Sequence, residues 1–147
     1  MIYYLDASAL VKVYSYEKGT EAIINLLESK LPFYSSIVIY PEVSFTLRRK
    51  MESREMDQKE FSKQVERFKS HFLSLINCVQ LNENILDVLE NRILQYSMRA
   101  LDAIHLASAL WVRENIDKDC GFICSDKNLL DFAEKESFNL INPEKED

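Results

Sequence analysis

Four acidic residues that are far apart in the sequence each fall where a strand is predicted to end or a helix to begin: Asp6, Glu42, Asp102 and Asp126. Taken singly, each acid is explained as a helix N-cap or first-turn residue. If the strands are parallel, however, their carboxyl ends meet at one edge of a sheet, where α/β proteins bind ligands. Four carboxylates at that edge repel one another unless divalent cations lie between them, and oxygen ligands select Mg²⁺ or Mn²⁺ over zinc.

Each acid has its own local setting. Asp6 follows an aromatic and β-branched stretch, 2–5, that predicts a buried strand, and Ser8 is expected to cap the helix that comes next. Glu42 lies in the first turn of a helix that Pro41 is suited to start. Asp102 begins an Ala-rich helix that is apolar around most of its circumference and is therefore expected to be central and buried.

Strands alternate with helices along the chain, which is typical of a parallel sheet covered on both faces. Strands are expected at 2–5, 33–39, 75–81 and 121–124, with a further edge strand at 138–141. Helices are expected at 8–16, 20–31, 40–51, 57–72, 84–98, 100–110 and 129–133, with a helical hairpin near 40–72. The predicted fold is a single α/β domain over 1–147, with a central parallel sheet of four to five strands and a polar tail at 143–147.

Composition and charge limit the classes of function. With 147 residues, 47% of them apolar, and only 2 Gly and 3 Pro, the chain is expected to be one ordered, helix-rich domain. The net charge of -6 argues against a simple basic nucleic-acid binder, but it is compatible with a nuclease whose acids hold metal ions. Most charges of the basic segment 48–69 are expected on a solvated face, whereas Arg48 and Arg49, about two turns from Glu42, are candidates for phosphate contact.

The cysteines and histidines point away from zinc and disulfides. Three cysteines without a C-x-x-C pair predict reduced, mostly buried thiols in a cytoplasmic protein. With only 2 histidines, a zinc site is not expected. His105, one turn after Asp102, is interpreted as a core histidine bonded to a neighbouring carbonyl or carboxylate rather than as a general base. No membrane span or signal peptide is expected.

The order and surroundings of the four acids resemble the PIN-domain family, and within it the VapC ribonuclease toxins of toxin–antitoxin pairs. The resemblance spans essentially the whole chain. It rests on the motifs LDASALVK at 5–12, YPEV at 40–43, LDAIHLASA at 101–109 and SDKNL at 125–129. The first and third motifs are specific, whereas the second rests on a single glutamate.

The resemblance implies a Mg²⁺- or Mn²⁺-dependent endoribonuclease that acts on RNA and is controlled by a small antitoxin. In such an enzyme, the catalytic residues that hold the metal would be Asp6, Glu42, Asp102 and Asp126. They would be supported by Ser8 and Asn128. A divalent cation in such a site lowers the pKa of bound water and stabilises charge that develops on a phosphodiester. Asp126 would either bind the metal directly or act on it through water or through Asn128. Apolar stripes on the first two helices and on the 40–72 hairpin offer surfaces for the partner or for a homodimer.

Two alternatives compete with this hypothesis. A PIN-like module that binds RNA or protein without catalysis would suit the acidic net charge, although the four intact acids argue against it. Aspartyl-phosphate chemistry could also use a strand-end aspartate such as Asp6. A phosphatase of that type is expected to carry a second acid two residues later, where this chain has Ser8.

Overall fold

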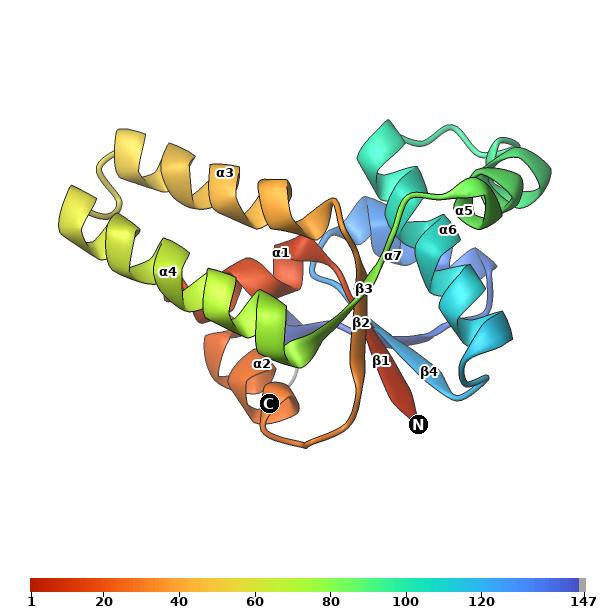
Figure 1. Ribbon diagram of the computed structural model, residues 1–147, viewed down its shortest axis with the longest axis horizontal. Coiled ribbons are helices and arrows are strands. Elements are labelled where there is room, and N and C mark those ends of the chain that lie inside the picture. The colour runs from red at the N-terminus through yellow and green to blue at the C-terminus, as the bar shows by residue number, and fades with distance from the viewer. Residues whose placement is uncertain (146–147) are drawn as a thin grey trace.

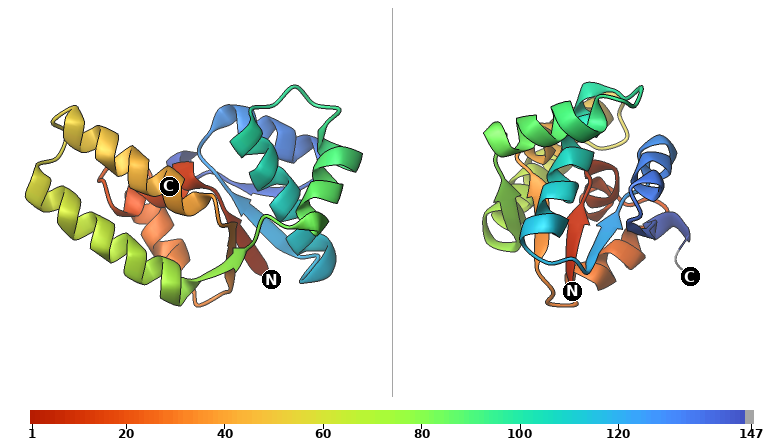
Figure 2. Two further views of the ribbon diagram at one scale, coloured as in Figure 1. Left: turned by 45° about the horizontal axis from the view of Figure 1, so that its top comes forward. Right: turned by 90° about the vertical axis from the view of Figure 1, so that its right-hand side faces the viewer.

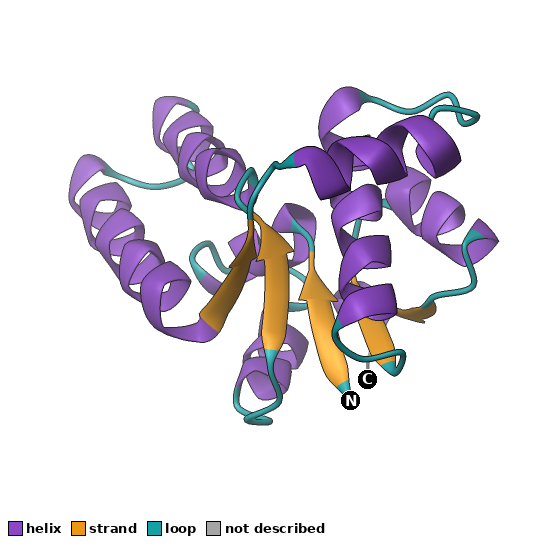
Figure 3. Cartoon of the chain, turned by 45° about the vertical axis from the view of Figure 1, so that its right-hand side comes forward, coloured by secondary structure: helices purple, strands orange, loops and turns teal. Residues whose placement is uncertain are grey.

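The sheet consists of five parallel strands. The computed structural model describes residues 1–145. The strands are β1 (Ile2–Leu5), β2 (Phe33–Ser36), β3 (Ile76–Val79), β4 (Cys120–Ile123) and β5 (Asn139–Ile141). Their order is β3-β2-β1-β4-β5, and all neighbouring strands pair in parallel, so their carboxyl ends lie along one edge (Figure 3). The predicted α/β class and parallel sheet are confirmed.

The helices connect successive strands. They are α1 (Ala7–Leu10), α2 (Thr20–Leu27), α3 (Ile39–Glu52), α4 (Gln58–Leu75), α5 (Glu83–Val88), α6 (Ala100–Asn115) and α7 (Lys127–Lys135). A 3₁₀ turn, η1 (Val11–Val13), continues α1, and a π-helix, η2 (Leu89–Ile93), continues α5. α3 and α4 form the predicted hairpin, which projects beyond the sheet (Figure 1).

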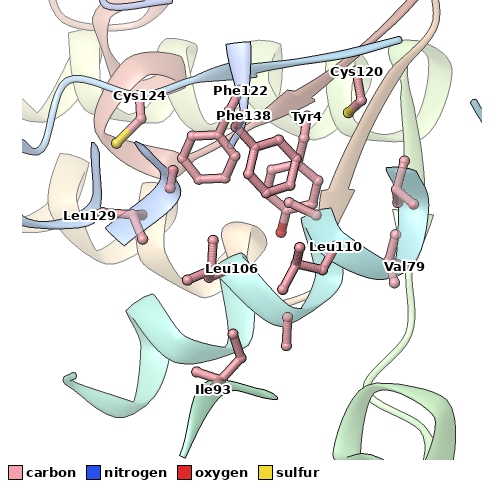
Figure 4. Packing of buried hydrophobic residues seen from close by; sticks show 14 of the residues in the cluster. Tyr4, Val79, Ile93, Leu106, Leu110, Cys120, Phe122, Cys124, Leu129 and Phe138 are labelled. Carbon is pink, nitrogen blue, oxygen red and sulfur yellow. The ribbon is translucent and has the colours of Figure 1, made fainter. Parts of the chain in front are cut away.

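Both faces of the sheet are covered by helices (Figure 2). Side chains alternate along a strand, so Tyr3 and Leu5 of β1 pack into a cluster with residues of α1–α4, whereas Ile2 and Tyr4 pack with residues of α5–α7. Figure 4 shows the second cluster, in which the rings of Tyr4 and Phe122 stack with centroids 5.6 Å apart. Burial on both faces explains why the first strand is apolar at every position.

Several predicted elements have different bounds, and the strand expected at 33–39 shows that an apolar run does not by itself separate strand from helix. The strand expected at 33–39 ends at Ser36, Ile37 and Val38 form a turn, and Ile39 begins α3. The helix expected at 84–98 ends earlier, since the backbone widens into η2, where the Leu94 amide donates to the Leu89 carbonyl at 2.8 Å.

Other helices also differ from the prediction, and among them α2, expected at 20–31, ends at Leu27. The helix expected at 8–16 is shorter, because α1 passes into η1 and the helical turns end at Val13. The helix expected at 100–110 is longer, since α6 extends to Asn115.

The segment expected to be a polar tail is partly structured. Residues 143–145 form a 3₁₀ turn, η3 (Pro143–Lys145), in which Pro143 is buried. The Glu144 carboxylate accepts a hydrogen bond at 3.0 Å from Nζ of Lys12, a lysine that is only 2% exposed. A buried ammonium requires such partners, and Glu17 provides a second one at 2.8 Å. The rest of the expected tail, 146–147, lies outside the described residues.

The expectations about membrane spans and cysteines concern the whole chain and are compared with residues 1–145. No helix there combines the length and the apolar character needed to cross a membrane. The three cysteines are free, with Cys78 partly buried and Cys120 and Cys124 buried, as predicted.

We predict that the ion pairs of Glu17 make stability depend on pH. Partial burial raises the pKa of Glu17, but Lys12 and Lys50 outweigh burial and hold that pKa below its usual value. A lowered pKa in the folded state contributes stability above the unfolded value, about 4.3, and that contribution is lost as pH falls through the folded value. Glu17→Gln should therefore cost about 1 kcal/mol at pH 7, as expected for partly exposed ion pairs, and the cost should shrink below about pH 4.

Urea unfolding between pH 3 and pH 7 measures this difference. Glu21→Gln is the matched control, because Glu21 is exposed and forms no ion pair among residues 1–145. An equal cost of Glu17→Gln at pH 3 and pH 7 would contradict the prediction.

Candidate active site

The carboxyl ends of β1 and β4 open onto a cleft. The strand order reverses direction between these two neighbours, and such a switch point is where open α/β sheets bind ligands. Their register runs from Ile2 opposite Cys120 to Leu5 opposite Ile123, so the residues that follow both strands emerge side by side. The cleft has a volume of about 590 Å³, and all four predicted acids line it.

Each acid is placed by the start of a helix or the end of a strand. Asp6 follows β1 and is only 5% exposed, and its backbone amide donates to the Ile123 carbonyl at 2.9 Å. Glu42 and Asp102 lie in the first turns of α3 and α6. Asp126 is the N-cap of α7, where its Oδ1 accepts the Leu129 amide proton at 3.1 Å.

Ser8 links Asp6 to the loop that follows β4. Its hydroxyl donates to Oδ2 of Asp6 at 2.6 Å and accepts the Ser125 amide proton at 2.9 Å. The expectation that Ser8 caps the helix is wrong, because Asp6 is the N-cap of α1 and accepts the Ser8 amide proton at 3.1 Å. Ser8 therefore holds the orientation of the Asp6 carboxylate, and it lines the same cleft.

His105 lies fully buried beneath the acids. Its Nε2 is 2.5 Å from Oε1 of Glu42 and 3.4 Å from Oδ1 of Asp6. Its Nδ1 is 2.8 Å from the Tyr4 hydroxyl, which accepts the Ser36 amide proton at 3.0 Å. In the neutral ring, the Tyr4 hydroxyl therefore donates its proton to Nδ1. The ring proton is then on Nε2, which donates it to Glu42. The interpretation of His105 as a satisfied core histidine is confirmed.

The charges in the cleft act strongly on one another. Burial, together with the negative charges of Asp126 and Asp6, raises the pKa of Asp102 above its usual value. Burial opposes a charge on His105, but Asp6 and Glu42 outweigh burial and raise the pKa of its imidazole. Burial therefore acts in opposite directions on these two pKa values, whereas the negative charge gathered in the cleft raises both.

The donor set suits a hard divalent cation, although the side chains are not already set as ligands. Within residues 1–145, no three His, Cys, Asp or Glu side chains form a finished metal-binding group. Asp6, Glu42 and Asp126 each use one oxygen in the protein hydrogen bonds described above. Oε2 of Glu42, Oδ2 of Asp126 and both oxygens of Asp102 accept no hydrogen bond from the described part of the chain. Carboxylate oxygens without protein donors, on a shared cleft, are the ligands that Mg²⁺ and Mn²⁺ prefer.

Of the remaining predicted residues, one lines the cleft and two do not. Arg49 lines the cleft. Arg48 does not, because its side chain is exposed and pairs with Glu52 at 2.9 Å along α3. Asn128 is exposed in the first turn of α7 and is not part of the cleft lining, and its supporting role stays a prediction.

Some residues near the acids were not singled out from the sequence. Tyr4 reaches the site only through His105, a contact that joins positions 101 residues apart. Arg99 lies before Asp102, with Nε 3.8 Å from Oδ2, but it is largely exposed. Phe45 lines the cleft, and its place one turn after Glu42 was a signal that helical spacing could have provided.

The fold and the acidic cleft define the class of this protein. The family model described as PIN domain matches residues 3–135, and the chain belongs to the PIN-domain family.

Within that family the chain is a homologue of VapC ribonucleases. It is 30% identical over 141 residues to ribonuclease VapC46 of Mycobacterium tuberculosis, covering 95% of this chain and 96% of the relative. Ribonuclease VapC45 of Mycobacterium tuberculosis is 30% identical over 109 residues, covering 74% of this chain and 75% of the relative.

Solved structures support the same fold. A toxin–antitoxin complex from Klebsiella pneumoniae contains a chain that superposes with a TM-score of 0.65 at 20% identity, covering 95% of this chain and 96% of that chain. A chain of VapBC2 from Rickettsia felis, bound to a DNA fragment from its promoter, superposes with a TM-score of 0.61 at 14% identity, covering 97% and 98%.

We predict that Tyr4→Phe destabilises the protein. The variant keeps the ring but leaves the buried Ser36 amide without its acceptor, at a cost of about 2 kcal/mol. Chemical unfolding of the two proteins at neutral pH measures the difference. Tyr34→Phe is the control, since the Tyr34 hydroxyl makes no hydrogen bond within residues 1–145. Equal stabilities of Tyr4→Phe and Tyr34→Phe would contradict the prediction.

Proposed function

We propose that this protein is a metal-dependent endoribonuclease of the VapC type and the toxin of a toxin–antitoxin pair. The observation that carries the proposal is the convergence of four carboxylates on one cleft at the switch point of the sheet. The raised pKa of Asp102 supports it, because burial and the nearby charges of Asp126 and Asp6 both disfavour a carboxylate there, and a bound cation would favour one. The similarity to proteins named ribonuclease supports RNA as the substrate.

In this proposal, Asp6, Glu42, Asp102 and Asp126 hold Mg²⁺ or Mn²⁺. When bound, such a cation lowers the pKa of water and stabilises charge that develops on a phosphodiester. Asp126 acts with the oxygen that does not cap α7, and the cap limits how far that side chain can turn.

The surrounding residues fix the acids in place. Ser8 holds Oδ2 of Asp6, so the other oxygen of this carboxylate faces Glu42 and His105. His105 holds Glu42 through Nε2 and is itself oriented by Tyr4. Hydrogen bonds that hold a carboxylate reduce the reorganisation needed when charge develops on the substrate, which is how a preorganised site lowers a barrier. Arg49 is the cleft residue that can pair with a backbone phosphate.

An antitoxin partner is part of the proposal. Two solved chains that share this fold come from a toxin–antitoxin complex and from VapBC2. A small open reading frame next to the gene, encoding a chain with a DNA-binding N-terminus, would support a pair. Co-expression should then yield a stable complex in which RNA cleavage is suppressed.

The central test is cleavage of RNA by the purified protein. We predict cleavage with Mg²⁺ or Mn²⁺ and complete loss of cleavage in EDTA. The cleavage rate should fall on the order of a hundredfold or more in Asp6→Asn, Glu42→Gln and Asp102→Asn, which is a larger loss than removal of a residue that only supports a metal ligand. Structured RNAs such as tRNA and unstructured RNAs both belong in the assay, because folded RNA is recognised by shape.

Asp131→Asn is the matched control for these variants. Asp131 is an exposed aspartate on α7 that does not line the cleft, so the change removes the same charge elsewhere on the protein. Cleavage that persists in EDTA, or an equal loss in Asp131→Asn and Asp102→Asn, would overturn the proposal.

We predict that Ser8→Ala weakens metal binding without removing a carboxylate. The hydroxyl orients Asp6, and residues that orient metal ligands are worth roughly 10–100-fold in affinity. Calorimetric titration with Mn²⁺ measures the change. Ser125→Ala is the control, because the buried Ser125 hydroxyl has no hydrogen-bond partner within residues 1–145. Unchanged Mn²⁺ affinity in Ser8→Ala would show that the hydrogen bond to Asp6 does not matter.

A second candidate function is an RNA- or protein-binding module without catalysis. The observation in its favour is the acidic net charge of -6, which such a module would suit. Calorimetry separates the two candidates. A nuclease binds Mn²⁺ with a heat that Asp102→Asn abolishes, whereas a binding module gives no heat that depends on the acids.

A further inference from the structure

One face of α3 carries four different chemical groups into the cleft. Glu42, Phe45, Thr46 and Arg49 all line it. Their spacing of three, four and seven residues places them in one stripe along the helix. At about 1.5 Å per residue, Arg49 lies about 10 Å along the helix from Glu42. An aromatic ring therefore lies between the acidic cluster and a cation.

Phe45 is exposed to a degree that packing does not explain. Its side chain is 62% exposed, whereas Val43 and Leu47, which face the sheet from the same helix, are fully buried. Leu101, at the start of α6, also lines the cleft and is 47% exposed. An apolar ring left in water gains free energy when a partner covers it, so the cleft contains an uncovered apolar surface beside its charges.

The charge of Arg49 is not neutralised by an acid. Its Nη2 donates to the Thr46 hydroxyl at 3.0 Å, and it makes no ion pair within residues 1–145. The neighbouring Arg48, by contrast, pairs with Glu52. A guanidinium held at one nitrogen by a hydroxyl still has a pair of donors for a phosphate.

We propose that Phe45, Thr46 and Arg49 form a binding subsite for one unpaired nucleotide next to the phosphodiester that is cut. This inference rests on the proposed ribonuclease function. The Phe45 ring stacks on the base, and Arg49 pairs with the phosphate on the far side of that base from the acidic cluster. The pattern of acid, ring and cation matches the alternation of phosphate, base and phosphate in a nucleic acid strand.

The subsite selects unpaired nucleotides because of what stacking requires. A base inside a duplex has both faces covered by its neighbours, so it cannot reach the ring without leaving the stack. Stacking accepts any base, since every base has a π-face. The subsite therefore selects a loop, a bulge or a single strand rather than a sequence, and sequence preference must come from other contacts.

Binding of short RNAs to the full chain tests the stacking contact. In an Asp6→Asn background, which prevents cleavage, fluorescence anisotropy compares a labelled single-stranded RNA with the same strand lacking bases at every position. Phe45→Ala should weaken binding of the complete RNA by on the order of tenfold and leave binding of the abasic strand unchanged. Arg49→Gln should weaken binding of both strands and reduce the salt dependence of both.

Two further variants distinguish a ring from a merely apolar side chain. Phe45→Trp should retain or strengthen binding and show quenched fluorescence on adding the complete RNA, whereas Phe45→Leu should behave like Phe45→Ala. Leu73→Ala is the control for lost exposed apolar surface, because Leu73 is 74% exposed on α4 and does not line the cleft. Full binding by Phe45→Leu would overturn the inference, because an aliphatic side chain does not provide the π-face on which a base stacks.

Cleavage rates distinguish failure of this inference from failure of the proposed function. With the otherwise unchanged chain and Mg²⁺, Phe45→Ala should lower kcat/KM on a single-stranded or looped RNA by on the order of tenfold. Equal rates of RNA cleavage by the wild-type protein and by Phe45→Ala would overturn the subsite alone. A protein that neither binds nor cuts RNA would overturn the proposed function and the subsite together.

Discussion

The parallel pairing of β1 with β4 is the constraint on which the rest of the site depends. These strands are separated by more than 110 residues, yet four residue pairs fix their register and bring the turns after Leu5 and Ile123 together. Asp6 and Asp126 follow from that pairing, and Ser8 joins the two turns by a hydrogen bond to each. A shift of one residue in this register would point every side chain of the strand to the opposite face of the sheet. The cleft is therefore as well defined as the core beneath it.

Beneath the cleft, polar groups are connected through the core. The chain of contacts runs from Ser36 through Tyr4 and His105 to Glu42. Each member satisfies the next, which is the condition under which buried polar groups do not destabilise a fold. The network also couples the end of β2 to the first turn of α3, so the acid on the helix is oriented by the sheet. Packing and site geometry are thus maintained by the same residues.

The architecture and the gathering of the acids were predictable from sequence, whereas the contacts that orient them were not. The alternation of apolar runs, with acids at their ends, was sufficient for a parallel sheet with Asp6, Glu42, Asp102 and Asp126 at one edge. Their role as metal ligands stays a prediction. The N-cap at Asp6 instead of Ser8 depends on the direction of a side chain, which spacing does not encode. Arg48 and Arg49 are adjacent in sequence, and only the rotation of α3 separates the one in the cleft from the one outside it.

The order of elements along the chain also has a consequence in time. During synthesis, β1, β2 and β3 leave the ribosome first, and β4 inserts beside β1 only after residue 123 has emerged. The last acid, Asp126, follows it, and α7 and β5 then cover that edge. Until then the nascent chain has three acids and an open edge at its central strand. A ribonuclease built in this order would thus have no complete cleft while the ribosome is still translating its own messenger RNA.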